Sequence, residues 1–384
     1  MIEAMKNKVN CCGCEACRVS CPFNCISMIK DEEGFLYPVI NKELCIKCGK
    51  CDTVCPIISK EKLIDDEEIY VYAGKDKNDI NRMESTSGGV FGVVAEYFLK
   101  NDGIVFGAAF NNKFEVEHIK IDKISRLSSL RGSKYVQSKI NDSYIKVKNY
   151  LKSDKLVLFS GVPCQVYGLY KFLGKNYNNL YTCAIVCHGV PSPEVFSKYK
   201  YYLEKKYKSK IIDIKFRNKI NGWEKSEFTV TFKNGKVYSN EVGKDLYTNS
   251  FLCDLYSRPS CHECKFKELP NKADFLLGDF WGIESEKEHF YDKKGVSLII
   301  TNEKGNNLLS ILSDKLIIEK ANIEHALKRN PYIIKSPAKS EKRDEFMIEY
   351  AEKKEFKYLI KKYMKPLRST ITNRIINKIY RIIK

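Results

Sequence analysis

Two stretches of the sequence, CCGCEACRVSCP at residues 11–22 and CIKCGKCDTVCP at residues 45–56, set four cysteines at the same offsets and close each set with proline. Both fit the spacing C-x2-C-x2-C-x3-C-P. One tight loop can point three thiols inward at three-residue spacing, whereas the fourth is better supplied from elsewhere. The proline removes a backbone donor and stops a helix from running on through the loop. The duplication therefore predicts two half-sites that complete one another.

A 4Fe-4S cluster needs four inward-pointing thiolates, and in two-cluster ferredoxins the cysteine before proline binds the other cluster. We therefore predict that residues 1–60 form a bacterial-ferredoxin-like domain with two 4Fe-4S clusters. The predicted ligands are Cys11, Cys14, Cys17 and Cys55 for cluster one, and Cys45, Cys48, Cys51 and Cys21 for cluster two. Cys12 and Cys25 fall outside this arrangement. The alternative is a pair of structural zinc sites, but such sites normally pair two C-x2-C knuckles.

The composition places these cysteines in a folded protein. The chain has 384 residues, of which 43% are hydrophobic and 12% aromatic, which is enough for two or three domains with real cores. The N-terminal residues lack an apolar targeting segment, and apolar windows such as GVFGVVAEYFL are too short to cross a bilayer. We expect a cytoplasmic protein, in which 16 cysteines favour metal ligation or redox chemistry over disulfides.

The charge balance is strongly basic, with 66 Lys and Arg against 48 Asp and Glu. Such an excess can attract nucleic acid, an anionic lipid surface or an acidic protein. Here it is mostly lysine spread along the chain, and no aromatic-rich basic motif of the RNA-binding kind accompanies it. We therefore expect no nucleic-acid partner.

Beyond residue 70 the sequence alternates strand and helix signals. KLVLFSGVPCQVYGLYKFLG (155–174) and LYTCAIVCHGVPSPEVFSKYKYYL (180–203) each read as strand, loop and helix. Asn234-Gly235 lies between two β-rich runs and predicts a hairpin. The predicted fold class is α+β: the ferredoxin-like domain, a mixed α/β domain over residues 70–335, and a basic helical tail over residues 336–384.

Five motifs carry a resemblance to a known family. They are STSGGVFGVVAEYFL (85–99), RGSKYVQS (131–138), GVPCQVYGL (161–169), CHGVPSPEVF (187–196) and ADFLLGDFWG (273–282). In this order they resemble the motif series of the coenzyme F-420 hydrogenase/dehydrogenase beta-subunit family. The resemblance covers residues 70 to about 335 and omits the two-cluster segment.

The resemblance implies that residues 70–335 bind FAD, with an iron-sulfur cluster close to the flavin ring. The implied flavin-binding residues are Ser85, Thr86, Ser87, Gly88, Gly89, Ser133, Lys134, Tyr135, Gln137, Gly161, Val162, Pro163 and Gln165. Independently, residues 85–89 would place small residues at a helix N-terminus, where phosphate binds, although such a stretch is more often an ordinary helix cap. Lys134 could supply a counter-charge or be a solvated surface lysine. No G-x-G-x-x-G fingerprint follows a strand, so the flavin would not be bound in the Rossmann manner.

A further cysteine set is implied to hold a third 4Fe-4S cluster beside the flavin: Cys187, Cys253, Cys261 and Cys264. A zinc site and unligated buried cysteines are the alternatives. On the same resemblance Cys164 would face the flavin. His188, next to a predicted ligand, and Asp279 are candidates for a role near the chemistry, with a turn histidine and a capping aspartate as the plain alternatives.

The expected function is that of an iron-sulfur flavoprotein oxidoreductase. Electrons from a ferredoxin or another low-potential donor would pass through 4Fe-4S clusters to FAD and leave as hydride to a small-molecule acceptor. The alternative is a non-catalytic electron-transfer subunit that docks on a larger redox enzyme. The basic tail could also lie on an anionic membrane or pack on the body, and self-association stays open.

Overall fold

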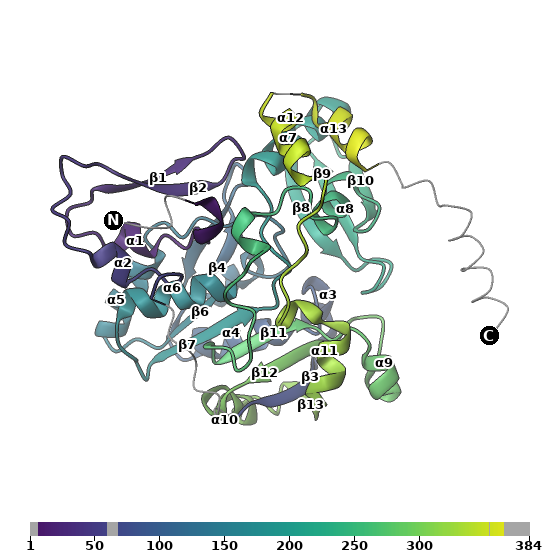
Figure 1. The fold of residues 1–384 in the computed structure, drawn as a ribbon. Coiled ribbons are helices and arrows are strands. Elements are labelled where there is room, and N and C mark those ends of the chain that lie inside the picture. The colour runs from purple at the N-terminus through teal and green to yellow at the C-terminus, as the bar shows by residue number, and fades with distance from the viewer. Residues whose placement is uncertain (1–6, 60–67, 353, 365–384) are drawn as a thin grey trace.

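The fold is built on a mixed sheet with strand order β13-β3-β12-β11-β7-β6-β4-β5, seen in the computed structural model, which describes residues 7–59, 68–352 and 354–364 (Figure 1). Strands β4, β6, β7 and β11 run parallel at its centre, and antiparallel strands flank them. The strands are β3 (Tyr70–Asp76), β4 (Ile104–Phe110), β5 (Val116–Ile121), β6 (Val157–Gly161), β7 (Leu180–Ile185), β11 (Phe275–Asp279), β12 (Ser297–Thr301) and β13 (Leu316–Lys320).

Helices cover both faces of this sheet. Alternate residues of a strand point to opposite faces, so Val157 and Phe159 pack with α5 (Ser143–Lys152) and α6 (Pro163–Leu173), whereas Leu158 packs with α4 (Val90–Lys100) and α10 (Glu303–Ile311). Burial on both faces explains why the central strands read as continuous apolar runs in the sequence. The shorter helices of this part are α3 (Asp79–Glu84), α9 (Ile283–Glu286) and α11 (Ile323–Arg329).

A second sheet, of order β10-β9-β8, lies beside the first at the upper right of Figure 1. Its strands are β8 (Ile211–Asn218), β9 (Glu227–Phe232) and β10 (Val237–Glu241), and the helices packed with it are α7 (Pro193–Tyr207), α8 (Leu246–Leu252), α12 (Arg343–Ala351) and α13 (Phe356–Tyr363). The predicted hairpin joins β9 to β10: Gly235 adopts φ 80°, and Val237 pairs with Thr231.

The N-terminal segment forms a small layer on the left of the molecule in Figure 1, next to α5 and α6. It contains α1 (Ala16–Ser20), α2 (Lys50–Thr53) and a hairpin of β1 (Ile26–Lys30) and β2 (Leu36–Ile40). Arg343 on α12 donates to both carboxylate oxygens of Glu33 in this segment, at 3.1 and 2.5 Å. The segment is thus held by residues from the far end of the chain.

The structure confirms the predicted mixed α/β architecture with parallel strand-loop-helix units at its centre. In the predicted basic tail, α12 and α13 pack against α7 within the aromatic core of the second sheet, while residues 365–384 lie outside the described residues. Within the described ranges, no helix has the length and apolar character to cross a membrane.

Candidate functional site

A cavity of about 650 Å³ lies at the carboxyl ends of the parallel strands. Ligands in α/β folds characteristically bind at this edge of a sheet. The predicted flavin-binding and catalytic residues that line the cavity are Ser85, Thr86, Ser87, Gly89, Ser133, Lys134, Tyr135, Gly161, Val162, Gln165, His188 and Asp279. Four others do not line it: Gly88, Gln137, Pro163 and Cys164.

The loop before α4 forms one wall of the large cavity. Gly89 adopts φ 88°, and the N–H of Gly88 donates to Ser297 Oγ at 3.0 Å. A side chain at Gly88 would not fit, because a Cβ there would lie 2.2 Å from the carbonyl oxygen of Gly74. The glycine pair therefore lets the chain turn against β3 and β12 and begin α4 at the cavity wall.

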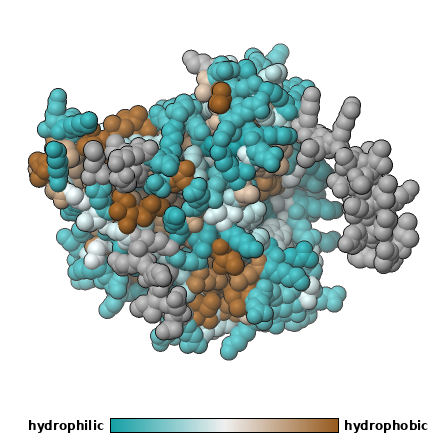
Figure 2. Space-filling model, in the orientation of Figure 1, coloured by the Kyte–Doolittle hydropathy of each residue, from teal (hydrophilic) through white to brown (hydrophobic). Residues whose placement is uncertain are grey.

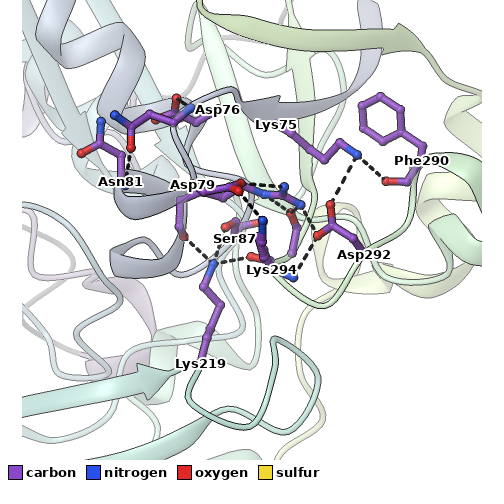
Figure 3. A network of polar contacts seen from close by, with 12 residues as sticks. Lys75, Asp76, Asp79, Asn81, Ser87, Lys219, Phe290, Asp292 and Lys294 are labelled. Carbon is purple, nitrogen blue, oxygen red and sulfur yellow. Dashed lines mark hydrogen bonds and ion pairs between the residues drawn. The ribbon is translucent and has the colours of Figure 1, made fainter.

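A buried lysine, Lys219, holds this loop through hydrogen bonds to backbone carbonyl groups. The Lys219 ammonium donates to the carbonyl oxygens of Arg82, Ser87 and Lys294, at 2.6, 2.8 and 2.5 Å (Figure 3). Burial lowers the pKa of Lys219 to about 7. Arg82 is paired in turn with Asp292. This network connects β8 to the 85–89 loop.

Two basic side chains, Lys134 and Arg131, line the cavity from the loop that contacts residues 85–89. Lys134 is tied to the backbone, because its ammonium donates to the carbonyls of Ser129 and Arg131, at 3.0 and 2.9 Å, and burial lowers its pKa to about 7. Arg131, which the sequence analysis did not single out, also lines the cavity. Its Nη1 is paired with Glu84 at 3.2 Å, whereas its buried Nε has no hydrogen-bond partner among the described residues. Thr86 Oγ1 accepts from the Ser133 N–H at 2.7 Å and connects the two loops.

The far wall of the large cavity is aromatic and charged. The rings of Trp223 and Trp281 stack with centroids 4.5 Å apart. Asp279 accepts from Arg217 at 2.8 Å with one carboxylate oxygen and from Trp223 Nε1 at 2.8 Å with the other. With both oxygens occupied, Asp279 orients Arg217 and Trp223. Sequence reasoning missed both partners, because neither lies in a recognised motif.

The first cysteine cavity brings together the predicted ligands of cluster one. Its lining includes Cys11, Cys14, Cys17 and Cys55, together with Cys12. Burial raises the pKa of Cys11, Cys17 and Cys55, that of Cys55 to about 11, and a hydrogen bond with Cys12 together with burial raises the pKa of Cys14. Among the described residues, no three Cys, His, Asp or Glu side chains are grouped closely enough to hold a single metal ion.

The predicted ligands of cluster two lie nearer the surface. Cys48 is exposed, and Cys21, Cys45 and Cys51 are partly buried against Cys25 and Ile26. The Sγ atoms of Cys21 and Cys25 are 3.3 Å apart. Cys25, which the spacing leaves out, therefore lies within this group.

A second cysteine cavity forms where the loops after β6 and β7 meet the segment after α8. The sulfur-bearing residues of its lining are Cys12, Cys164, Cys187, Cys261 and Cys264. Burial raises the pKa of Cys261 to about 12 and that of Cys264 to about 11. The structure thus brings three of the four predicted third-cluster ligands together, with Cys164 beside them.

Four of the predicted site residues lie elsewhere than the sequence predicted: Cys253, Cys164, Pro163 and Gln137. Cys253 is exposed at the end of α8 and does not line the second cysteine cavity. Cys164 lines that cavity and not the large one, because it is the second residue of α6, behind the loop that Gly161 and Val162 form. Pro163 lines the second cysteine cavity as well. Gln137 donates to the Cys12 carbonyl at 3.1 Å and accepts from Arg258 at 3.0 Å.

The three cavities are neighbours in a series. The two cysteine cavities share Cys12 and Ile57. The second cysteine cavity and the large cavity share Val162, Cys187, His188, Gly189 and Val190. His188 lies at this boundary with Nε2 3.1 Å from Asp254 Oδ1 and its ring edge-on to Tyr332, 4.4 Å between centroids. One wall of side chains therefore separates each cavity from the next.

Comparison with known proteins gives matches of three kinds, namely a family model, a curated relative and solved structures. Residues 154–326 match the family described as the carboxyl terminus of the coenzyme F420 hydrogenase/dehydrogenase beta subunit. The F subunit of F(420)H(2) dehydrogenase from Methanosarcina mazei is 24% identical over 272 residues, which span 66% of this chain and 71% of that protein. A chain in the xenon-derivatised F420-reducing [NiFe] hydrogenase complex from Methanosarcina barkeri aligns with a TM-score of 0.47 and 17% identity, over 71% of this chain and 92% of that chain.

Proposed function

We propose that this chain, which belongs to the coenzyme F420 hydrogenase/dehydrogenase beta-subunit family, carries electrons from a low-potential donor through iron-sulfur clusters to FAD and on to a small acceptor. Membership gives the chain an oxidoreductase role in electron transfer. The clusters, the flavin and the hydride acceptor are our proposal. The observation that carries it is the series of two cysteine cavities and one large cavity with shared walls.

The cysteine cavities suit iron-sulfur clusters by their donor chemistry. Thiols whose pKa is raised by burial stay protonated at neutral pH unless a metal displaces the proton. Four thiols with a raised pKa line the first cavity, and Cys164, Cys187, Cys261 and Cys264, whose pKa values are also raised, line the second; for Cys14 and Cys164 a hydrogen bond with Cys12 adds to the effect of burial. We propose these sets as ligands, with Cys21, Cys45, Cys48 and Cys51 holding a further cluster near the surface. The division into residues 1–60, 70–335 and 336–384 is part of this proposal.

The large cavity suits a flavin dinucleotide in size and in polarity. The N-terminus of α4 lies beside it, and in the part of the chain that the structure describes neither a side-chain cap at Gly89 nor a partner for the buried Arg131 Nε is present. Both features favour an anionic group such as a pyrophosphate. Ser133 and Thr86 would bind next to it, while the Trp281 and Arg217 wall would contact the acceptor.

When bound, the clusters move single electrons and the flavin exchanges one or two, which couples them to hydride chemistry. The chain's own residues position these groups. Lys219 holds the 85–89 loop, Asp279 orients Arg217, and His188 stands between the second cysteine cavity and the large one. His188 is placed to donate a hydrogen bond or a proton to a bound acceptor, and Arg217 is placed to donate a hydrogen bond.

The decisive experiment is anaerobic purification followed by measurement of iron, acid-labile sulfide and extracted flavin per chain. We expect about twelve irons and one FAD, with flavin bleaching when reduced ferredoxin is added. About eight irons without flavin would contradict the proposal, because the large cavity would then lack its occupant. Loss of donor-driven but not dithionite-driven flavin reduction in Cys264→Ser would place the second cysteine cavity on the electron route.

A second candidate function is a non-catalytic subunit that docks on a larger redox enzyme. Two observations favour it: the relative from Methanosarcina mazei is itself named as a subunit, and the N-terminal segment exposes apolar side chains, visible as brown surface on the left of Figure 2. These residues are Phe23, Ile29, Val39, Leu44, Ile46 and Ile58, exposed by 44–62%. Turnover of a small hydride acceptor by the isolated, fully loaded chain would exclude this candidate.

A further inference from the structure

Arg258 is buried completely between the N-terminal segment and the second cysteine cavity. It precedes the short helix Pro259–Cys261, and its backbone N–H donates to the Val190 carbonyl at 2.9 Å, next to the wall shared with the large cavity. Its side chain extends away from this loop into the N-terminal segment. No motif in the sequence singles out this residue.

The guanidinium of Arg258 makes four hydrogen bonds around the first cysteine cavity. Nε donates to the Cys11 carbonyl at 2.7 Å, and one terminal nitrogen donates to Cys11 Sγ at 3.5 Å and to the Leu36 carbonyl at 3.0 Å. The other terminal nitrogen donates to Gln137 at 3.0 Å. The guanidinium also lies over the Tyr37 ring, 4.2 Å from its centroid. Each of its nitrogens therefore has a partner, but each partner is neutral when the thiol is protonated.

Other buried arginines of this protein have a carboxylate partner. Arg343 is paired with Glu33, Arg82 with Asp292, and Arg217 with Asp279. In the described ranges Arg258 has no such ion pair. The groups that act on its charge are Cys11, Cys12 and Cys261 from both cysteine cavities, and Tyr37. A buried cation without a counter-ion is strongly destabilising, so an anion is needed at this point.

We propose that Arg258 is the counter-ion of the anionic cluster held by Cys11, Cys14, Cys17 and Cys55, and that it raises the reduction potential of this cluster above that of the cluster near Cys48. The inference rests on the proposed function. Reduction adds one electron from the external donor and breaks no bond, so the site gains one negative charge. A fixed cation and an N–H···S hydrogen bond both stabilise that additional charge.

The proposed difference in reduction potential gives electron transfer between the two clusters a direction. Electrons that enter at the exposed Cys48 side collect at the Cys11 site, which shares Cys12 and Ile57 with the second cysteine cavity. The lysines near Cys48, Lys42, Lys47 and Lys50, are exposed, so solvent screens their charge. The buried guanidinium has no such screening.

The test is a redox titration of the iron-loaded protein, followed by electron paramagnetic resonance, for wild type, Arg258→Met and Arg258→Lys. We expect Arg258→Met to lower the midpoint potential of one cluster. At a fixed potential the ratio of reduced to oxidised cluster should fall at least tenfold, which corresponds to about 59 mV for one electron. Arg258→Lys keeps the charge and should shift the midpoint less. The matched control, Arg343→Lys, perturbs another buried arginine at the same interface and should leave all midpoints in place. Unchanged midpoints in Arg258→Met, or an equal shift in the control, would overturn the inference.

A second measurement tests the role of Arg258 in the wild-type protein, so that its result does not depend on whether the variants fold. Protein grown with arginine carrying ¹⁵N only in its guanidinium should show ¹⁵N hyperfine coupling on the reduced cluster, because Arg258 bonds directly to Cys11 Sγ. The other arginine near this cluster, Arg18, directs its guanidinium to Glu15 and Asp142 instead. Absence of ¹⁵N coupling in a protein with its full iron content would refute the proposed role of Arg258 and leave the proposed function in place. A shortfall of iron would count against the proposed function itself.

Discussion

The N-terminal segment and the second cysteine cavity are both built around cysteines, but they are specified in different ways. In the N-terminal segment, the thiols of the first cavity come from two short repeats within residues 11–55, with Cys55 of the second repeat beside three predicted ligands of the first. The second cavity takes Cys164, Cys187 and the 261–264 pair from three distant stretches. Local spacing therefore identifies the first set, whereas the second set was predicted only in part, and tertiary packing is needed to replace Cys253 by Cys164.

The largest effect that would sharpen this comparison concerns Cys164 and Cys253. We expect Cys164→Ser to lose about four irons per chain, because its thiol lines the second cavity. The matched variant Cys253→Ser should keep its full iron content, since that thiol is exposed outside the cavity. Iron and sulfide analysis of both proteins decides. Iron loss confined to Cys253→Ser would restore the assignment made from sequence.

The next effect tests how the N-terminal segment is held to the body. Arg343→Ala leaves the Glu33 carboxylate without its bidentate partner in a mostly buried position, at a cost of about 3–5 kcal/mol. Urea unfolding followed by cluster absorbance should show the clusters lost at lower urea than in wild type. The exposed Lys30–Glu194 pair is the control, because Lys30→Ala should cost under about 1 kcal/mol. Equal effects would mean that Arg343 contributes no more than a surface pair.

A smaller effect is a pH dependence of stability that arises outside the N-terminal segment, because all five histidines lie beyond residue 117. His118 is buried beside the large cavity, and burial lowers its pKa to about 4. The folded protein holds it neutral while the unfolded chain binds a proton below pH 6.5, so this contribution is complete above pH 6.5 and falls as pH drops toward 4. Between about pH 8 and pH 5.5 the loss is about 1.4 kcal/mol. Thermal unfolding of His118→Gln should lack this pH-dependent increment, and identical slopes would contradict the prediction.

The smallest effect concerns Cys25, which lies beside Cys21 although the repeat leaves it out. Cys25→Ala should retain the full iron content, because Cys21, Cys45, Cys48 and Cys51 already supply four thiols. Its cost in stability should be about 1 kcal/mol, the loss of one small buried group. A loss of about four irons would show instead that the local spacing does not specify this ligand set.

The sequence predicted the features that depend on neighbouring residues. The Asn234-Gly235 hairpin, the strand-loop-helix units and the loop of small residues before α4 are local, and the structure contains each of them. The family resemblance implied Cys253 as a member of the third set, because it lies near or between the family-like motifs. Its position at the end of α8 leaves it exposed to solvent, which no spacing rule could reveal.

The residues that sequence reasoning missed are those whose meaning depends on burial. Arg217, Arg131 and Arg258 are three of many basic residues in a lysine-rich chain. Their three-dimensional surroundings distinguish them. Arg217 is paired with a carboxylate, Arg131 lines the large cavity, and Arg258 donates to a thiol of the first cysteine cavity. Composition hides such residues, because an excess of charge on the surface has the same appearance in the sequence.

The ion pair between Glu33 and Arg343 also determines when the N-terminal segment can be anchored during protein synthesis. The two residues are 310 positions apart, which a ribosome covers in roughly 15 to 60 s at about 5–20 residues per second. The cysteines of the N-terminal segment therefore emerge first, while Arg258 and Arg343 emerge much later. Until then the segment has neither its counter-ion nor its anchor. We expect iron to be inserted stably only after translation is nearly complete, so a truncated chain would present its thiols to the cell's metal-delivery machinery without retaining the metal.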